Sequence, residues 1–165
     1  MLYLILILSV IIVIISSMNT FSIWLKPCAK SIPMKVKLPG NLPVIALSNN
    51  GKVLNFLIDS GSNLSHICKE YLQDIDAEMI GTYTQGEVTG LGGKNTGITM
   101  CSATLKDTVG HNYKVKLSVS NQLMDVMKTI ESSTGITIHG LLGTDFLQKY
   151  NYVIDFDSLE VYPKK

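Results

Sequence analysis

Residues 56–67 read FLIDSGSNLSHI, an apolar run that ends in one acid, two serines and a glycine before apolar residues return. An aspartate at the end of an apolar strand costs free energy unless it is hydrogen-bonded or needed for chemistry. This stretch therefore singles out Asp59, and the rest of the chain decides which of the two explanations holds.

The chain is long enough for one domain with a hydrophobic core. It has 165 residues, and one domain is the default at that length. Its net charge is only +1 and no basic stripe is visible, which argues against nucleic acid as the main partner. Hydrophobic residues make up 46% of the chain and charged residues 16%, but much of the apolar excess lies at the start.

No charged side chain occurs in residues 1–25. Residues 1–15 read MLYLILILSVIIVII, and the uncharged run that they begin matches the roughly 20 apolar residues that cross a bilayer. Trp24 suits the membrane interface. A cleavable signal peptide is the competing interpretation, but no Lys or Arg precedes the run and residues 15–17 make a poor cleavage site. We expect residues 1–25 to be an uncleaved, single-pass transmembrane anchor.

The segment after the anchor bears on orientation. Three cysteines, an odd number without framework spacing, favour a reducing compartment. Lipid attachment at Cys28 is disfavoured, because Lys and Pro stand where small residues are expected.

Residues 26–34 contain two prolines and no periodicity, so we assign residues 26–37 to a tether and 38–165 to the folded domain. Lysines flank only the C-terminal side of the anchor, which favours a cytoplasmic domain: Lys26, Lys30, Lys35 and Lys37.

Short apolar runs separated by turn residues predict a mostly-β domain. The first pair of runs flanks Asn-Asn-Gly, a strong hairpin signal, and Thr144 is expected to cap the last helix. The expected hairpins are residues 42–47 with 53–58, 97–106 with 113–120, and 152–156 with 159–162, and helical patterns are confined to 69–74, part of 121–132, and 144–150.

Residues 86–97, GEVTGLGGKNTG, contain five glycines. Glycine at this density permits positive φ angles and close approach of the backbone. A phosphate-binding loop is one interpretation, but the Walker A spacing is absent and no helix follows the loop. The flanking strands favour the mobile tip of a β-hairpin, which can close over a ligand.

Three segments follow one another in a recognisable order: Asp-Ser-Gly-Ser at 59–62, Thr-Gly-Leu-Gly-Gly at 89–93, and His-Gly-Leu-Leu-Gly-Thr-Asp-Phe-Leu at 139–147. This order resembles the retropepsin-like aspartic proteases, the single-domain relatives of retroviral proteases, over roughly residues 38–162. The resemblance implies an all-β fold: a closed retropepsin-like β-barrel with a flap hairpin and one short C-terminal helix, here preceded by the transmembrane helix.

The resemblance also implies site residues. Asp59 would carry the catalytic carboxylate, Ser60 would brace the two active-site loops, and Gly61 would leave room beside the carboxylate and offer it a backbone N–H. Ser62, often Ala in retroviral enzymes and Ser in the pepsins, is expected to hydrogen-bond Asp59. The flap over an extended peptide substrate would comprise Val88, Thr89, Gly90, Leu91, Gly92 and Gly93.

An aspartic protease needs two carboxylates that share a proton. The sequence at 153–157, Val-Ile-Asp-Phe-Asp, echoes the first segment and raises Asp155 as an internal partner of Asp59. No glycine follows Asp155, however, and Phe156 fills the next position, so a turn or surface role is favoured. The simplest completion is a C2 homodimer in which Asp59 meets its twin, with the anchor confining both copies to a plane.

The remaining candidates receive structural interpretations. His66, His111 and His139 lack metal-ligand spacing, so neither a metal nor another cofactor is expected. Asp145 is expected to cap or brace the C-terminal helix. No serine lies in a Gly-x-Ser-x-Gly elbow with an obvious base. Packing roles are expected for Leu141, Leu142, Leu147, Met124 and Met127.

The leading hypothesis is a membrane-anchored, homodimeric aspartic endopeptidase that hydrolyses peptide bonds. The alternative, from another class, is a catalytically silent retropepsin-like module that binds peptides or dimerises at the membrane. The intact Asp-Ser-Gly-Ser argues against that alternative, because a pure binder needs no paired acid. A membrane-bound β-domain with a chance motif would require the two later segments to be coincidental.

Overall fold

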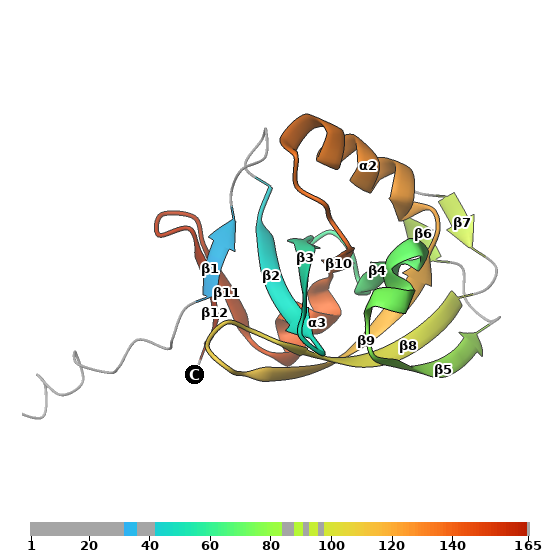
Figure 1. Ribbon diagram of the computed structural model, residues 1–165, viewed down its shortest axis with the longest axis horizontal. Coiled ribbons are helices and arrows are strands. Elements are labelled where there is room, and N and C mark those ends of the chain that lie inside the picture. The colour runs from blue at the N-terminus through green and yellow to red at the C-terminus, as the bar shows by residue number, and fades with distance from the viewer. Residues whose placement is uncertain (1–31, 36–41, 84–87, 91–92, 96–97, 165) are drawn as a thin grey trace, which may run out of the picture.

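The computed structural model describes residues 32–35, 42–83, 88–90, 93–95 and 98–164 (Figure 1). Short apolar runs become strands, as expected. The strands are β1 Ile32–Lys35, β2 Val44–Asn49, β3 Lys52–Ile58, β4 His66–Cys68, β5 Ala77–Tyr83, β6 Val88–Gly90, β7 Gly93–Asn95, β8 Ile98–Lys106, β9 Asn112–Ser120, β10 Gly140–Leu142, β11 Tyr152–Asp155 and β12 Glu160–Pro163. The helices are the 3-10 helix η1 Lys69–Asp74 and the α-helices α2 Leu123–Thr134 and α3 Thr144–Lys149.

The main sheet closes on itself. Its strands neighbour one another in the order β11-β12-β1-β2-β3-β10-β4-β9-β8-β5, and a further pairing of Ser48 in β2 with Lys106 in β8 joins two distant strands. Strands β2, β3, β10, β4, β9 and β8 therefore form a closed ring, and β11, β12 and β1 extend it beyond β2. Closure removes most of the unpaired strand edges that would otherwise need protection. The expectation of a closed all-β barrel is confirmed.

The three hairpins expected from the sequence are present. Asn50 and Gly51, with φ angles of 47° and 81°, make the turn between β2 and β3. Two successive positive φ angles define the type I′ turn that Asn-Gly favours. Strands β8 and β9 pair along their whole length, and β11 pairs with β12. Local turn chemistry therefore fixed these pairings.

The barrel interior is filled by alternate residues of the long strands. In β8 and β9 the inward-facing positions are buried and those between them are more exposed, which is the period of two expected for a strand with one face on the core. Met127, Leu141 and Leu142 are buried, and Met124 and Leu147 pack against the two core clusters, which confirms their packing roles. Interior residues that are no more than 1% exposed include Ile45, Leu47, Leu54, Phe56, Ile67, Leu105 and Leu117.

Helix α2 lies across the outside of the barrel (Figure 1). The expected short C-terminal helix is present as α3, but α2, with 12 residues, is a further and longer helix where a helical pattern was expected only in part of 121–132. Leu123, Met127 and Ile130 recur at helical spacing and pack with Val44 and Leu141 in a second cluster outside the barrel. Gly135, with a φ of 68°, ends the helix. The helix therefore covers part of the outer face of the sheet.

The predicted anchor, residues 1–25, lies outside the described residues. Among the helices that the structure does describe, none combines the length and apolar character needed to span a bilayer. Strand β1 falls inside the range assigned to the tether, so the folded domain begins before residue 38. Pro33 pairs with Glu160 of β12, but β2 pairs only with Met34 and Lys35, so one side of the strand has no partner at Pro33. Proline, which has no N–H to donate, is tolerated at such an edge position.

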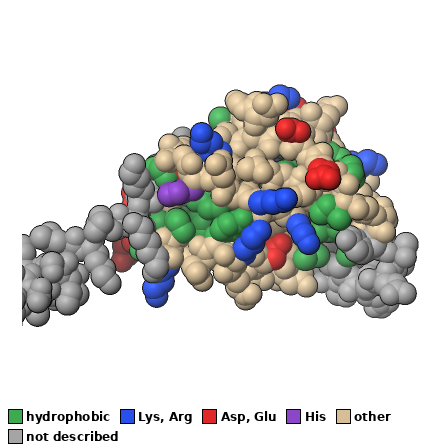
Figure 2. Space-filling model, turned by 90° about the horizontal axis from the view of Figure 1, so that it is seen from below, with side chains coloured by type: hydrophobic (Ala, Val, Ile, Leu, Met, Phe, Trp, Pro, Cys, Tyr) green, Lys and Arg blue, Asp and Glu red, His purple; other side chains and the backbone are tan. Residues whose placement is uncertain are grey.

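Lysines mark the outer face of β9. Strands β8 and β9 form the lower side of the molecule in Figure 1, and Figure 2 shows lysine side chains gathered on that side. Lys114, Lys116 and Lys149 line a hollow of about 300 Å³ there. Nζ of Lys149 donates to the carbonyl of Lys114 at 2.6 Å and lies 5.1 Å from the centre of the Tyr150 ring. These contacts tie the end of α3 to β9.

The turn between β8 and β9 is organised by Asp107, which is only 4% exposed. Its carboxylate accepts hydrogen bonds from the Tyr113 hydroxyl at 2.7 Å, from Nδ1 of His111 at 2.7 Å, and from the backbone N–H groups of Val109 and His111 at 2.9 Å each. Burial alone would raise the pKa of Asp107, but these hydrogen bonds outweigh burial and hold the pKa below its ordinary value. The ionised carboxylate therefore stabilises this turn.

We expect Asp107→Asn to lower the free energy of unfolding by about 1–3 kcal/mol at neutral pH, because it removes a charge from a buried hydrogen-bonded group. A carboxyl whose pKa is depressed in the folded state stabilises above its unfolded pKa of about 4, and this contribution is lost as the pH falls through the folded value. Urea titrations from neutral pH to about pH 3 should show the gap between wild type and variant closing. Asp76→Asn, at an exposed acid, is the control, and a gap independent of pH would contradict the assignment.

Candidate active site

The Asp-Ser-Gly-Ser loop begins where β3 leaves the barrel. The backbone N–H of Ile58 donates to the Pro43 carbonyl at 2.8 Å, and that of Asp59 donates to the Leu142 carbonyl at 3.0 Å. The Asp59 side chain is half-buried, and its Oδ1 accepts the Gly61 N–H at 2.8 Å. The N–H of Ser62 donates to the Asp59 carbonyl at 3.2 Å and closes a tight turn. The loop thus holds one carboxylate at a fixed place at the mouth of the barrel.

Strand β10 lies between the two strands that flank this loop. It runs parallel to β3, with Leu142 opposite Ile58, and antiparallel to β4, with Leu141 opposite His66. Strand β10 therefore lies between the two ends of the Asp59 loop, although Leu142 is 84 positions from Ile58 and Leu141 is 75 positions from His66 in sequence. This arrangement brings two of the three segments of the sequence motif together.

Hydrogen bonds from the end of β10 and the start of α3 lock the loop in place. Ser65 Oγ donates to Oδ1 of Asp145 at 2.7 Å and accepts the Gly143 N–H at 3.0 Å. The backbone N–H and the hydroxyl of Thr144 both donate to the Ser62 carbonyl, at 2.8 Å and 3.1 Å. Ser65 is fully buried, so these bonds replace water for its hydroxyl. We call this set of contacts the loop lock: Ser62, Ser65, Gly143, Thr144 and Asp145.

Two glycines allow the close approach that the lock needs. A Cβ atom built on Gly143 would lie 2.6 Å from the Leu64 carbonyl oxygen and 2.8 Å from that of Ser62. A Cβ atom on Gly140 would lie 2.2 Å from the His66 carbonyl oxygen and 2.9 Å from Cε1 of Phe56. Both pairs of contacts are far inside van der Waals distance, so only glycine fits at either position.

The structure corrects two expectations about individual hydroxyls. Ser62 Oγ does not bond Asp59 as expected; it donates to the Leu64 carbonyl at 2.7 Å, because that acceptor lies two residues ahead in the same turn. Thr144 is not the cap of α3: Gly143 holds that position, and the Thr144 hydroxyl is engaged in the loop lock. The expectation for Asp145 is confirmed, because its carboxylate braces the helix through Ser65 and the Phe146 N–H.

Sequence reasoning missed Ser65 and the lock contact of Thr144. Ser65 is an ordinary polar residue six positions after Asp59, and its partner Asp145 lies 80 residues further along the chain. The sequence did contain one relevant signal, the two glycines Gly140 and Gly143 in the third segment. Glycine often occurs where another stretch of backbone approaches closely.

The expected flap is partly described. β6 and β7 form a separate two-stranded antiparallel sheet that pairs Val88 with Asn95, Thr89 with Lys94, and Gly90 with Gly93. Leu91 and Gly92, expected at the tip, lie outside the described residues. The hairpin follows β5, the strand that pairs only with β8 within the described sheet. The two strands of the expected hairpin are therefore present at this place in the chain.

Asp155 is a turn acid. Its Oδ1 accepts the N–H groups of Asp157 at 2.9 Å and Ser158 at 3.1 Å in the hairpin between β11 and β12. Hydrogen bonds from Ser158 and Asp157 lower the pKa of this carboxyl. The favoured interpretation of Asp155 as a turn residue, and not as a second reactive acid, is thereby supported.

The histidines have separate environments. Nδ1 of His139 accepts the Asn55 N–H at 3.0 Å, and its ring lies 4.7 Å from that of Tyr71 between centroids, so His139 has a structural role. His111 belongs to the Asp107 turn. His66 lies next to Ser65 on β4, and its Nδ1 is buried with no hydrogen-bond partner in the described part of the chain. Among the described residues no three His, Cys, Asp or Glu side chains gather as metal ligands would.

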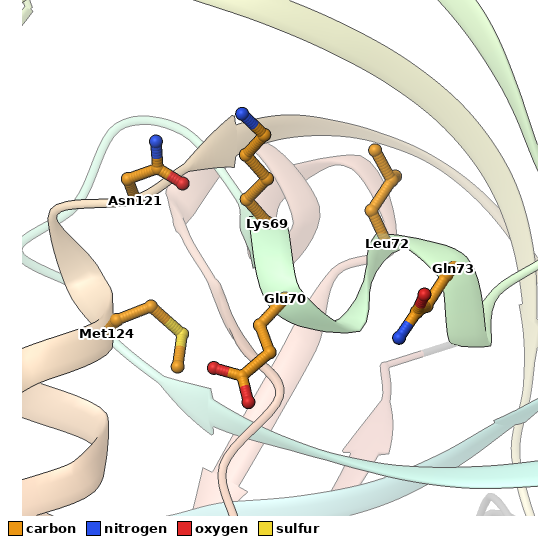
Figure 3. A pocket seen from close by; sticks show the side chains of 6 residues that line it. All are labelled: Lys69, Glu70, Leu72, Gln73, Asn121 and Met124. Atoms are coloured by element: carbon orange, nitrogen blue, oxygen red, sulfur yellow. The ribbon is translucent and has the colours of Figure 1, made fainter.

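A second hollow lies away from the Asp59 loop. It has a volume of about 710 Å³ and opens between η1 and the start of α2, where Lys69, Glu70, Asn121 and Met124 line it together with Leu72 and Gln73 (Figure 3). Glu70 in this hollow pairs with Lys128 at 3.6 Å. Since β4 and β9 are parallel, the residues that follow both strands meet here. The hollow contains no residue of the loop lock.

No family model matches the sequence, and no curated protein matches it. Three solved structures with similarity are EIAV protease bound to the inhibitor HBY-793 (21% identity over 67% of this chain and 88% of that chain, TM-score 0.47), a retropepsin-like aspartic protease from Rickettsia conorii (19% identity, 81% and 99%, TM-score 0.45), and the foamy viral protease-reverse transcriptase with an RNA/DNA hybrid (13% identity, 66% and 12%, TM-score 0.43).

Proposed function

We propose that the chain is an aspartic endopeptidase that works as a homodimer, with one Asp59 from each copy. The observation that carries this proposal is the placement of Asp59. The carboxylate at the end of a buried strand accepts a backbone N–H, and the loop that carries it is held by hydrogen bonds from a segment 80 residues away. So much support for one half-buried acid is typical of a group positioned for chemistry.

Two such carboxylates complete a peptide-hydrolysing site. Like charges at hydrogen-bonding distance cannot both ionise, so the pair holds one proton between them and titrates as a unit. The ionised carboxylate takes a proton from a water molecule, and the protonated one hydrogen-bonds the scissile carbonyl and transfers its proton as the water attacks. Ser60 is exposed in the single chain, so its hydroxyl is free to reach the loop of a second copy.

The described residues of a single chain offer one suitable acid, Asp59, and a second copy supplies the other. The hairpin of β11 and β12 supports a place for that copy. β11 ends the described sheet, so one of its edges is unpaired. Phe156 and Leu159 beside the turn are 56% and 44% exposed, and Leu159 adopts a φ of 56°, which is strained for a branched apolar residue. Exposed apolar groups in a turn, next to a free strand edge, suit self-association about a two-fold axis.

We also propose that residues 1–25 anchor the domain in a membrane, with the domain in the cytoplasm. The uncharged run of residues 1–25 and the lysines that follow it support this part of the proposal. An anchor confines the copies to a plane and raises their effective concentration, which favours a weak dimer. The peptide substrate would lie extended beneath the β6–β7 hairpin and pair with its backbone.

The experiment that tests the proposal uses the full-length chain in detergent micelles. Cleavage of a peptide library is measured by mass spectrometry over a range of protein concentrations, with and without a pepstatin-type transition-state analogue. We expect inhibitor-sensitive cleavage whose rate per chain rises with the fraction of dimer. Inhibitor-sensitive cleavage by a strict monomer would contradict the homodimeric site.

A paired substitution tests the proposed contact surface. We expect Phe156→Asp together with Leu159→Asp to weaken the dimer by at least about tenfold, since each change places a charge in an apolar contact. Sedimentation equilibrium measures the dissociation constant. Val53→Asp, at an apolar residue that is 63% exposed elsewhere on the barrel, is the matched control. An unchanged dissociation constant in the double variant would place the interface on another surface.

A further inference from the structure

A row of lysines follows the outer face of β9. Tyr113, Val115 and Leu117 of this strand are buried inside the barrel. Successive side chains of a strand point to opposite faces, so the residues between these three point outward. Two of the outward-pointing residues are Lys114 and Lys116, and both are exposed. The lysines alternate with apolar residues in the sequence, and they gather on one face because the segment is a strand.

Two further lysines extend this row. Lys106 of β8 stands opposite Asn112 of β9, and residues opposite one another in neighbouring strands carry their side chains on the same face. Lys149 reaches the row from α3, since its Nζ donates to the Lys114 carbonyl. Figure 2 shows lysine side chains gathered on this side of the molecule. We call the four exposed side chains the lysine face: Lys106, Lys114, Lys116 and Lys149.

The lysine face keeps positive charge that no carboxylate neutralises directly. None of its ammonium groups forms an ion pair with an acid among the described residues. Asp145 lines the hollow of about 300 Å³ between the lysines and α3, but its Oδ1 is already engaged by the Ser65 hydroxyl. Asp76 and Glu78 share a separate hollow with Lys114 on the side of β5. The face is therefore most positive on the side of α3.

The chain enters the domain from the side that carries the lysine face. β1 points upward in Figure 1, so it begins in the lower half of the molecule, where β8 and β9 lie. Only residues 26–31 separate the proposed anchor, residues 1–25, from β1. Even when fully extended, a segment of this length spans at most about 20 Å. In an anchored chain the lower side of the domain is therefore held close to the bilayer.

We infer that the lysine face docks on the anionic lipid headgroups of the membrane that holds the anchor. The anionic lipids of a cytoplasmic leaflet attract lysines that lie close to the bilayer surface. The hollow lined by Lys114, Lys116 and Lys149 offers ammonium groups to a headgroup phosphate. Docking fixes how the domain is turned on its short tether. This inference rests on the membrane anchor in the proposed function and is independent of catalysis.

The test measures the exposure of single lysines in the full-length protein. The protein is reconstituted in nanodiscs of phosphatidylcholine, with or without phosphatidylserine, and a water-soluble acylating reagent labels its amines. Mass spectrometry gives the acylation rate of each lysine. We expect Lys114 and Lys116 to react at least about fivefold more slowly in the discs that contain phosphatidylserine, the factor that one lysine contributes near an anionic surface. High salt should restore both rates. Lys69, in the hollow between η1 and α2, is the internal control and should react equally in both discs.

A double substitution tests whether charge holds the lysine face to the lipid. In the variant Lys114→Gln with Lys116→Gln, we expect the acylation rate of Lys149 to become equal in the two kinds of disc. The matched control is Lys69→Gln with Lys128→Gln, which removes the same charge from exposed positions on η1 and α2. In that control Lys149 should stay protected by phosphatidylserine. Protection of Lys149 that survives the first double substitution would overturn docking through the lysine face.

Two results with the unmodified protein would also overturn the inference. One is equal acylation of the lysine face in both kinds of disc. The other is equal acylation in the discs together with slower acylation in detergent micelles after a DNA duplex is added, which would identify nucleic acid as the partner.

Failure of the proposed function gives different results. A protein that does not enter the discs, as size-exclusion chromatography would show, refutes the anchor and the inference with it. A protein that enters them and reacts equally in both refutes the inference and leaves the anchor intact. Protection of the lysine face in a protein that cleaves no peptide would support docking and refute the proposed protease.

Discussion

Asp59→Asn is expected to abolish peptide cleavage while the fold and peptide binding persist. Asparagine cannot take a proton from water or give one to the leaving group, and general acid–base catalysis contributes typically 10²–10⁴-fold. Because both copies lose the group together, we expect a loss of at least about 10³-fold. The fold should survive, since the amide oxygen can still accept the Gly61 N–H. The measurement is the rate of library cleavage together with the urea midpoint.

The control for this substitution is Asp155→Asn. Asp155 accepts two backbone N–H groups in the β11–β12 turn, and asparagine can keep them. Cleavage activity should therefore be unchanged in Asp155→Asn. If Asp155 were the internal partner of Asp59, this substitution would abolish cleavage. Cleavage that persists in Asp59→Asn would refute the proposed site. Wild-type protein that binds peptides without cleaving them would point to the catalytically silent module instead.

Gly140→Ala is expected to cost about 3 kcal/mol or more of the free energy of unfolding, the upper range for forcing an atom into a packed interior. The new methyl group would meet the His66 carbonyl oxygen at 2.2 Å, and both strands are held by neighbours on either side. Relief would require β10 to separate from β4, and the loop lock joins the residues just before β4 to those just after β10. Since domains are stable by only about 5–15 kcal/mol, we expect a large fall in the urea midpoint.

Gly110→Ala separates crowding from backbone conformation. Gly110 has a φ of 97° and no atom within 4 Å of an added Cβ, so the change costs only the left-handed conformation, about 1–2 kcal/mol. Similar losses of unfolding free energy in Gly110→Ala and Gly140→Ala would contradict the view that close packing of backbones is the reason for glycine at position 140.

Local signals in the sequence were reliable. Asn50-Gly51 fixed the first hairpin, and strict alternation fixed β8 and β9, because a turn and its flanking strands are encoded within about twenty residues. The Asp59 loop was found for the same reason. By contrast β4 and β10 have three residues each and are strands only because each fits between longer ones. No pattern within three residues distinguishes them from a loop.

The parallel pairings explain the remaining errors. β10 pairs with β3 across more than eighty positions, so the partners of Ser62 and Thr144 depend on the closed barrel and not on neighbours in sequence. The Ser62 hydroxyl was assigned to Asp59 by resemblance, but it donates to the carbonyl of Leu64. Helix α2 was only partly anticipated, because its apolar positions are spaced for packing against the outer face of a sheet whose strands are distant in sequence.

The loop lock also orders events in time. Ser65 bonds Asp145, which lies 80 residues later in the chain, and Ser62 bonds Thr144, which lies 82 residues later. Neither bond can form before the later residue has been synthesised. A chain leaving the ribosome presents Asp59 long before residues 140–145 have been made, and through that interval nothing can hold the loop in its final shape. Contacts this distant also slow folding. The nascent polypeptide therefore carries Asp59 in an unassembled loop until synthesis is nearly finished.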